Sequence, residues 1–214
     1  MSNNSIISLA NLLKAQVNDH KRDIDKLVFD KRVWQQTLSG QINQIGELKP
    51  EDIRLDDVAA SLSKICRYNG HIKVFLSVAE HSVEVSRVVP EEYAAWALLH
   101  DAHEAYVGDI IRPMCHLIGP NLINEIKDTY DRAIAERFGL SAIYNDAGAK
   151  REIRYADDRM LMTERELFLN KPPQSWGDYL ESLPHYNDVY ADGTHDWVDS
   201  RRMFLDRAAE LGIS

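Results

Sequence analysis

The sequence is poor in cysteine and lacks a long apolar run. Only Cys66 and Cys115 occur among 214 residues, so no disulfide framework holds the fold, and a reducing compartment is indicated. The longest uninterrupted apolar stretch, residues 93–99, is far shorter than the roughly 20 residues that cross a bilayer. The chain also shows no basic segment followed by an apolar run at its start, so no secretory signal is expected. We therefore expect a soluble, cytoplasmic protein with no membrane partner.

Basic residues are in the minority. The 25 lysines and arginines are outnumbered by 34 aspartates and glutamates, which gives a net charge of −9 at pH 7. This balance argues against binding along a nucleic-acid backbone, which needs a broad basic surface. A small anionic ligand stays compatible with the charge, because a metal ion and one or two arginines can reverse the sign of the field inside a cleft.

Convincing alternating strands are missing too, although Val189 and Tyr190 could pair locally. Apolar residues instead recur at three- and four-residue steps, which is typical of amphipathic helices. Helices are predicted at about 55–66, 78–89, 91–106, 122–134 (closed by Gly139) and 147–169, and a last one starts at an N-cap, Thr194 or Asp196. The sequence predicts an all-α fold.

The organisation of the chain follows from its charge and composition. Residues 1–32 are amphipathic but highly charged and are predicted to form an N-terminal helical extension. Residues 33–214 form the main domain, with a core at about 41–170 and a C-terminal loop and helix at 171–214. No repeat or linker divides this domain.

Ionisable side chains occur where the helical periodicity predicts core positions. His81 lies inside the apolar stripe of its helix, while His100 and Asp101 directly follow the most hydrophobic run of the chain. Glu104 shares one side of the predicted 91–106 helix with His100 and Asp101. Burying such groups without a partner costs several kcal/mol in practice, so each needs a partner, a proton change or a metal.

The long predicted helix distinguishes between two adjacent acids. With successive side chains 100° apart, Asp157 and Glu164 fall within the apolar stripe and Asp158 falls outside it. Asp157 is therefore predicted to be buried, Asp158 to be a solvated neighbour, and Glu164 to form hydrogen bonds within the packing. His71, His103 and His116 are predicted to lie at the surface or behind the site.

Two imidazoles and two carboxylates from separate helices could converge in a bundle. This donor set suits Zn²⁺, Mn²⁺, Fe²⁺ or Co²⁺, whereas Mg²⁺ and Ca²⁺ prefer oxygen alone. A single core histidine is more often hydrogen-bonded than metal-bound, and a His-Asp pair arises readily by chance. From the spacing alone, a metal site and a set of buried hydrogen bonds both remain open.

Three motifs resemble the HD-domain phosphohydrolase superfamily, whose pattern is H…HD…D across a helical bundle. They are residues 77–82 (SVAEHS), residues 98–113 (LLHDAHEAYVGDIIRP) and residues 156–157 (AD) with 163–164 (TE). The similarity extends from about residue 41 to 166. Within the superfamily, the motifs are similar to those of bacterial 5′-deoxyribonucleotidases and of phage-type HD phosphohydrolases, including phage dATP triphosphohydrolases.

The resemblance implies a role for each matching residue. The implied metal ligands are His81, His100, Asp101 and Asp157. Glu104 and Asp109 match carboxylates that position or activate water, donate a proton, or hold a second divalent ion such as Mg²⁺ or Co²⁺. Arg67, Tyr68 and Pro113 match residues that contact the phosphate, sugar and base of the substrate. Relatives form dimers or larger assemblies such as hexamers, so a homo-oligomer is expected as well.

The expected activity is hydrolysis of the 5′ phosphoester of a deoxyribonucleotide. Either phosphate is released from a dNMP or triphosphate from a dNTP, and Lys64, Lys73 and Arg112 are candidates to bind a longer phosphate chain. Gly70 stands where adenine-selective relatives carry a bulky aliphatic residue, which weakens the expectation of a preference for adenine. The alternatives are a phosphodiesterase for cyclic or signalling nucleotides, and a non-catalytic helical module with a structural metal.

Overall fold

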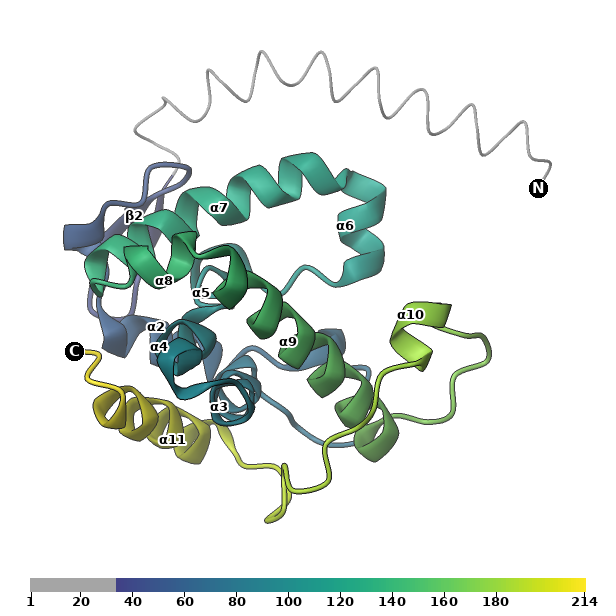
Figure 1. The fold of residues 1–214 in the computed structure, drawn as a ribbon. Helices are drawn as coiled ribbons and strands as arrows, with labels where there is room; N and C mark the ends of the chain where they lie inside the picture. The colour runs from purple at the N-terminus through teal and green to yellow at the C-terminus, as the bar shows by residue number, and fades with distance from the viewer. Residues whose placement is uncertain (1–33) are drawn as a thin grey trace, which may run out of the picture. The chain divides into compact units, whose positions relative to one another are not determined.

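The computed structural model describes residues 34–214 (Figure 1), so the predicted N-terminal extension at 1–32 lies outside the described residues. The chain divides into two compact units after Leu48, and each is described by itself. The first unit contributes a short hairpin. The second, Lys49–Ser214, contains the helices and all the candidate site residues.

The hairpin pairs β1 (Trp34–Gln36) with β2 (Ile42–Gln44) in antiparallel register, with Gln35 opposite Asn43. Gly40 adopts a φ of +83° in the connecting turn, a conformation that glycine reaches without steric cost. These strands were not predicted. Each has three residues, which is too short for an alternating pattern to be recognisable.

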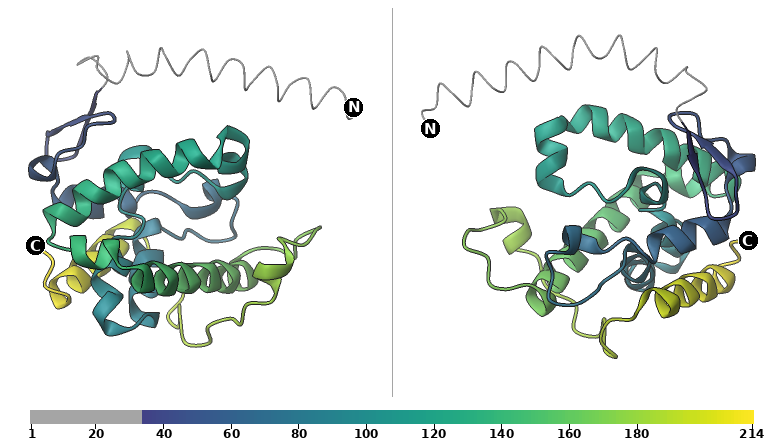
Figure 2. Two further views of the ribbon diagram at one scale, coloured as in Figure 1. Left: turned by 45° about the horizontal axis from the view of Figure 1, so that its top comes forward. Right: turned by 180° about the vertical axis from the view of Figure 1, so that it is seen from behind.

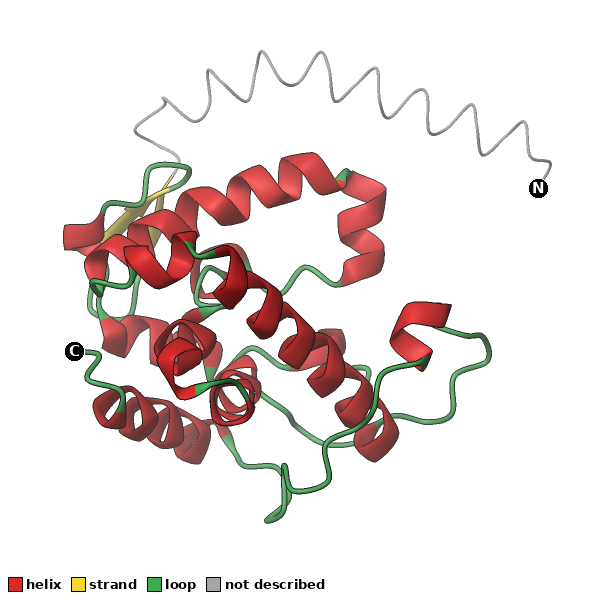
Figure 3. Cartoon of the chain, in the orientation of Figure 1, coloured by secondary structure: helices red, strands yellow, loops and turns green. Residues whose placement is uncertain are grey.

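The second unit is all-α, as predicted, and Figure 3 shows its helices joined by loops. In chain order it contains η1 (Pro50–Asp52), α2 (Leu55–Leu62), η2 (Arg67–Gly70), α3 (Val78–Val88), α4 (Glu91–Leu99), α5 (Glu104–Val107), α6 (Arg112–Ile118), α7 (Pro120–Arg137), α8 (Ser141–Asn145), α9 (Ala147–Phe168), α10 (Asp178–Glu181) and α11 (Trp197–Glu210). Among the described residues, no helix combines the length and apolarity needed to cross a membrane.

Helix α3 lies at the centre of this unit, packed against α4, α9 and α11 (Figure 2). Ser77 caps it, because its side chain accepts a hydrogen bond from the Glu80 amide at 3.1 Å. Every residue from Val78 to Ser86 is buried, so this helix has no solvated face along that stretch. Polar side chains on α3, including His81, are consequently forced into the interior, where they need partners.

The predicted continuous helix at 91–106 is wrong, because the chain breaks after Leu99. The amides of Ala102 and Glu104 donate to the carbonyls of Leu99 and Asp101, three residues back, at 2.9 Å each. These tighter turns separate α4 from α5. His100 and Asp101 therefore lie in a turn and not on one regular helical face with Glu104.

Other element boundaries agree closely or differ for local reasons. Helix α9 ends one residue before its predicted limit, and Asp196, one of the two predicted caps, accepts from the amides of Val198 and Asp199. Helix α2 stops at Leu62, four residues early, and the unpredicted α6 begins at Arg112. In the C-terminal loop, α10 forms a single helical turn, and Val189 and Tyr190 form no strand.

Candidate metal centre

The four predicted ligands converge from three parts of the fold. His81 comes from α3, His100 and Asp101 from the turn after α4, and Asp157 from α9. His81 Nε2 lies 3.2 Å from Asp157 Oδ1 and 3.8 Å from Asp101 Oδ2. His100 Nε2 lies 3.3 Å from Asp101 Oδ2 and 4.0 Å from Asp157 Oδ1. The structure thus brings two nitrogens and two oxygens around one point.

Each imidazole is oriented by its other ring nitrogen. His100 Nδ1 donates to the Ala97 carbonyl at 2.7 Å, and His81 Nδ1 donates to Glu164 Oε1 at 2.6 Å. The Nε2 atoms of both rings are buried and make no hydrogen bond of good geometry. Metal-binding histidines typically have this arrangement, in which one nitrogen is held by an acceptor and the other is left for the ion.

The separations fit a single divalent cation. Ligand atoms about 2.0–2.1 Å from a tetrahedral Zn²⁺ lie roughly 3.4 Å from one another, and octahedral ions give somewhat shorter and longer separations. The four His–Asp separations of 3.2–4.0 Å span this range. Nitrogen and carboxylate ligands together favour a transition metal such as Zn²⁺, Mn²⁺, Fe²⁺ or Co²⁺. The residues present therefore fit the ion that the family resemblance implies.

The electrostatics of the cluster also favour a cation. Burial alone would lower the pKa of His100, but Asp101 and Asp157 raise that pKa to about 9. Burial would raise the pKa values of Asp101 and Asp157. The imidazoles outweigh burial and hold both pKa values well below the usual range; His100 acts chiefly on Asp101 and His81 chiefly on Asp157. The carboxylates thus remain ionised and attract positive charge into the centre.

The structure reverses the prediction about the two adjacent aspartates. Asp158 is the buried residue, with 1% of its surface exposed, while the side chain of Asp157 is 24% exposed. Asp158 is covered because Arg112 Nη2 binds its Oδ1 at 2.6 Å and the Tyr179 hydroxyl donates to its Oδ2 at 3.3 Å. Asp157 lies at the edge of the helix stripe, where the core gives way to a cleft.

That cleft has a volume of about 820 Å³ and extends from the ligand cluster. Asp101, Asp157 and the predicted catalytic residues Glu104 and Asp109 all line it. Glu104 is buried, and its Oε2 has no hydrogen-bond partner. Burial, reinforced by the charge of Asp101, raises the pKa values of both Glu104 and Asp109. Both carboxyl groups therefore retain or accept a proton more readily than a solvated acid does.

The predicted substrate residues lie along the same cleft. Arg67 is buried, and its Nε donates to Glu164 Oε2 at 2.9 Å. Tyr68 adopts a φ of +60°, which is uncommon for a residue with a side chain, and its hydroxyl donates to Glu164 Oε2 at 2.8 Å. Pro113 is exposed on the cleft wall.

Other lining residues were missed by sequence reasoning. Trp176 and Tyr179, from the C-terminal loop and α10, line the cleft, and the Trp176 ring lies 6.5 Å from that of Tyr68. Lys127 from α7 lines it as well. These residues lie far from the H…HD…D motifs in the sequence, and no local pattern marks them. His103 is buried with Nδ1 3.0 Å from Asp131 Oδ1, and so lies behind the site and not at the surface.

Comparison with known proteins identifies two bacterial relatives. The chain is 38% identical over 148 residues to the uncharacterized protein YfdR of Escherichia coli (strain K12), covering 69% of the chain and 79% of YfdR. It is 37% identical over 145 residues to the uncharacterized protein RCAP_rcc00048 of Rhodobacter capsulatus, covering 64% of the chain and 73% of that protein. No family model matches the chain.

Proposed function

The chain belongs to the protein family that includes YfdR of Escherichia coli, and we propose that it is a metal-dependent phosphohydrolase that cleaves the 5′ phosphoester of deoxyribonucleotides. The observation that carries the proposal is the pair of buried, unpartnered Nε2 atoms of His81 and His100, which lie within 4 Å of the Asp101 and Asp157 carboxylates. These four residues would hold the ion. Their order in the sequence matches the H…HD…D pattern of HD-domain phosphohydrolases, which supports the same proposal.

The ion, when bound, supplies Lewis-acid activation of water and of a phosphoryl oxygen. Glu104 orients the attacking water and accepts its proton, because its Oε2 is unpartnered at the cleft wall. Asp109, which also lines the cleft, donates a proton to the leaving 5′ oxygen. With these two roles, the site takes a proton from the attacking water and gives a proton to the leaving group in the same reaction.

The remaining side chains bind the substrate. The Arg67 guanidinium neutralises phosphate charge at the inner end of the cleft, where its Nη1 lies 3.9 Å from Asp101 Oδ2. Tyr68 and Trp176 offer two aromatic faces to the sugar and base. Pro113 contributes an apolar surface to the same cleft. Recognition of a nucleoside monophosphate needs these three features together: one cationic group, an aromatic surface and an apolar wall.

A single phosphate fits the charge of the cleft better than a triphosphate. Of the three cations considered for a longer chain, Arg112 lines the cleft, but Asp157 and Asp158 already pair with it. Lys73 donates to the Leu169 carbonyl and Lys64 stacks on Trp197, and neither lines the cleft. Lys127 and Arg154 line the cleft as well, but carboxylates still outnumber lysines and arginines among the lining residues, so the net charge disfavours two further phosphates.

The test is to incubate the full chain with Mn²⁺ or Co²⁺ and a panel of dNMPs, dNTPs and cyclic nucleotides, and to identify the product. We expect inorganic phosphate from dNMPs. Triphosphate from dNTPs would contradict the preference for a single phosphate but keep the enzyme class. Opening of cyclic nucleotides alone would show a phosphodiesterase. Bound metal without hydrolysis of any nucleotide would overturn the proposal in favour of a non-catalytic module.

The proposal also covers the partner, the location and the oligomeric state of the enzyme. The partner is a small nucleotide, and the two free thiols, Cys66 and Cys115, are compatible with a cytoplasmic location. A homo-oligomer, dimeric or hexameric, is proposed from the family resemblance. Light scattering that gives the mass of one chain would contradict it.

A further inference from the structure

Glu164 is a fully buried carboxylate that accepts four hydrogen bonds. Its Oε1 binds His81 Nδ1 at 2.6 Å and the Tyr190 hydroxyl at 2.7 Å. Its Oε2 binds Arg67 Nε at 2.9 Å and the Tyr68 hydroxyl at 2.8 Å. No part of its side chain is exposed. One residue of α9 therefore contacts a proposed metal ligand and both proposed substrate residues that precede α3.

The two oxygens of Glu164 serve different parts of the site. Oε1 faces the metal ligand His81, and Oε2 faces the substrate residues Arg67 and Tyr68. An ionised carboxylate is acceptor-only, so it can satisfy all four donors at once, whereas an amide can satisfy at most those that face its oxygen. The geometry therefore requires a glutamate here and not a glutamine.

Tyr190 reaches Glu164 from the C-terminal loop. Its backbone φ of +54° is uncommon for a residue with a side chain and is retained only where the surroundings impose it. The ring packs edge-on against Phe168 with centroids 5.3 Å apart. This strained residue gives the loop a hydrogen bond directly behind the proposed metal ligand His81.

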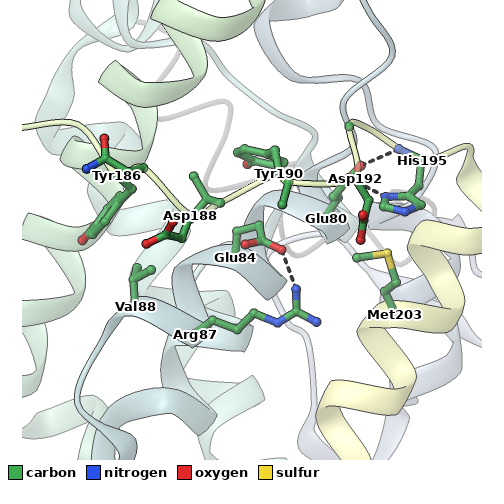
Figure 4. Close-up of a pocket in the computed structure, with 14 residues that line it drawn as sticks. Glu80, Glu84, Arg87, Val88, Tyr186, Asp188, Tyr190, Asp192, His195 and Met203 are labelled. Carbon is green, nitrogen blue, oxygen red and sulfur yellow. Dashed lines mark hydrogen bonds and ion pairs between the residues drawn. The ribbon is translucent and has the colours of Figure 1, made fainter.

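A second contact, five residues after Tyr190, also fixes the C-terminal loop. Glu80 accepts a hydrogen bond from the His195 ring at 2.8 Å and another from the His195 amide at 3.2 Å, and Figure 4 shows these contacts beside Tyr190. A cavity of about 570 Å³ lies along this part of the loop and is lined by Tyr190, Glu80 and His195. The backbone of Tyr190 thus belongs to an anchored loop, and its hydroxyl contacts Glu164.

We propose that Glu164 and Tyr190 are positioning residues of the site: Glu164 orients His81 through Oε1 and the Arg67–Tyr68 pair through Oε2, and Tyr190 fixes Glu164 through the oxygen that it shares with His81. This inference rests on the proposed function, because it assigns His81 to the metal and Arg67 to the substrate. It predicts that the two oxygens of Glu164 have separable effects.

The first test measures metal binding without substrate. The full chain, freed of metal, is titrated with Co²⁺, and the visible absorption of the ion reports its affinity and ligand environment. Glu164→Gln should weaken Co²⁺ binding by about 10–100-fold, the range found when the residue that orients a ligand is lost, and Tyr190→Phe by about tenfold. Tyr144→Phe is the matched control, because its hydroxyl also donates to a carboxylate, that of Asp128, away from the ligand cluster.

The second test separates the two oxygens by kinetics at saturating metal. Tyr68→Phe, which removes a donor from Oε2, should raise KM and leave Co²⁺ affinity unchanged. Tyr190→Phe should weaken Co²⁺ binding and leave KM nearly unchanged, and Glu164→Gln should do both. A structural role alone would lower the melting temperature of Tyr190→Phe and Tyr144→Phe alike and would move neither the Co²⁺ spectrum nor KM.

The outcomes distinguish this inference from the proposed function. If the wild type binds Co²⁺ and hydrolyses nucleotides while Glu164→Gln and Tyr190→Phe bind Co²⁺ as the wild type does, the positioning roles are overturned and the function stands. If the folded wild type binds no Co²⁺, the metal centre is overturned, and these roles with it. Weakened Co²⁺ binding in both variants, with Tyr144→Phe unaffected, supports the inference.

Discussion

Arg112 Nη2 donates to Asp158 Oδ1 at 2.6 Å and thereby joins the first residue of α6 to the middle of α9. Asp158 is buried, whereas the Arg112 side chain is 47% exposed. The other oxygen of Asp158 accepts from Tyr179, at the start of the α10 wall of the cleft. One carboxylate of the cleft lining therefore holds two other lining residues, Arg112 and Tyr179, in place.

Asp158→Asn should loosen the cleft without removing the metal. The substitution weakens a charged hydrogen bond to a half-exposed guanidinium by about 1 kcal/mol. We expect this loss to fall on substrate binding, where it corresponds to a roughly fivefold increase in KM with kcat little changed. Steady-state kinetics checks this expectation. Asp56→Asn, which weakens the exposed pair between Asp56 and Arg201, should leave KM unchanged. A lower kcat at constant KM in Asp158→Asn would contradict the assignment.

Asp157→Asn should lose the metal, in contrast to the substitution of its neighbour. Asp157 Oδ1 lies 3.2 Å from His81 Nε2, whereas Asp158 contacts neither imidazole. Metal content by mass spectrometry should approach one ion per chain in the wild type and in Asp158→Asn, and should fall severalfold in Asp157→Asn. Chelation should also lower the melting temperature of the wild type, because an ion at 100 times its Kd stabilises the fold by about 2.7 kcal/mol. Equal metal content in the two variants would refute this ligand assignment.

Glu104→Gln should slow turnover strongly while the metal stays bound. Glu104 is buried at the cleft wall with an unpartnered oxygen, and general acid–base groups typically contribute about 10²–10⁴-fold to kcat. The expected result is a loss of kcat in that range with unchanged metal content. Glu91→Gln, in the exposed first turn of α4, should retain full activity. Turnover at the wild-type rate in Glu104→Gln would remove its catalytic role.

The contribution of Glu181 to stability should depend on pH. Its oxygens accept from Arg165 at 2.6 and 2.9 Å and from the Trp176 amide at 3.0 Å, and the Arg165 hydrogen bond foremost lowers its pKa to about 2. A carboxyl whose pKa is lower in the folded state stabilises fully above its unfolded pKa, about 4.5, and loses this contribution as the pH falls toward the folded value. The melting temperature of Glu181→Gln should therefore lie below that of the wild type at pH 7, and the difference should shrink between pH 5 and 3. A difference that stays constant over this range would contradict the linkage.

The cap of the last helix offers a test of stability away from the cleft. Asp196 accepts from the Val198 and Asp199 amides at 2.8 and 3.0 Å. Asp196→Ala should destabilise the protein by about 1 kcal/mol, whereas Asp196→Asn, which caps equally well, should have little effect. Urea unfolding monitored by circular dichroism measures both. Equal losses in the two variants would show that the charge, and not the cap, matters.

Much of the helical framework could be predicted because long amphipathic helices carry a strong periodic signal. Helix α9 was located to within one residue, since its stripe is regular and Pro172 and Pro173 follow it. The hairpin gave no such signal, and no glycine or proline marks the break after Leu99. There, hydrogen bonds to carbonyls three residues back replace the regular ladder, and tertiary packing selects them.

The residues of the candidate site could be predicted, but the residues that contact them from other segments could not. The four residues that the family resemblance implies as ligands lie close together. The relative burial of Asp157 and Asp158 was predicted wrongly, because Arg112 and Tyr179 cover Asp158 from other segments and local periodicity cannot reveal them. Glu164 was expected to form hydrogen bonds within the packing, but its four donors come from three separate segments.

The turn after Leu99 has a consequence for anyone who would transplant this centre into a designed bundle. Neighbouring residues on an unbroken α-helix project about 100° apart, yet His100 Nε2 and Asp101 Oδ2 lie 3.3 Å from each other. The tighter turns here do not reduce that angle, so the two donors approach each other through their side-chain conformations, with the His100 ring held by the Ala97 carbonyl. A graft must therefore reproduce these conformations and the acceptors that hold them, and not only the four residues.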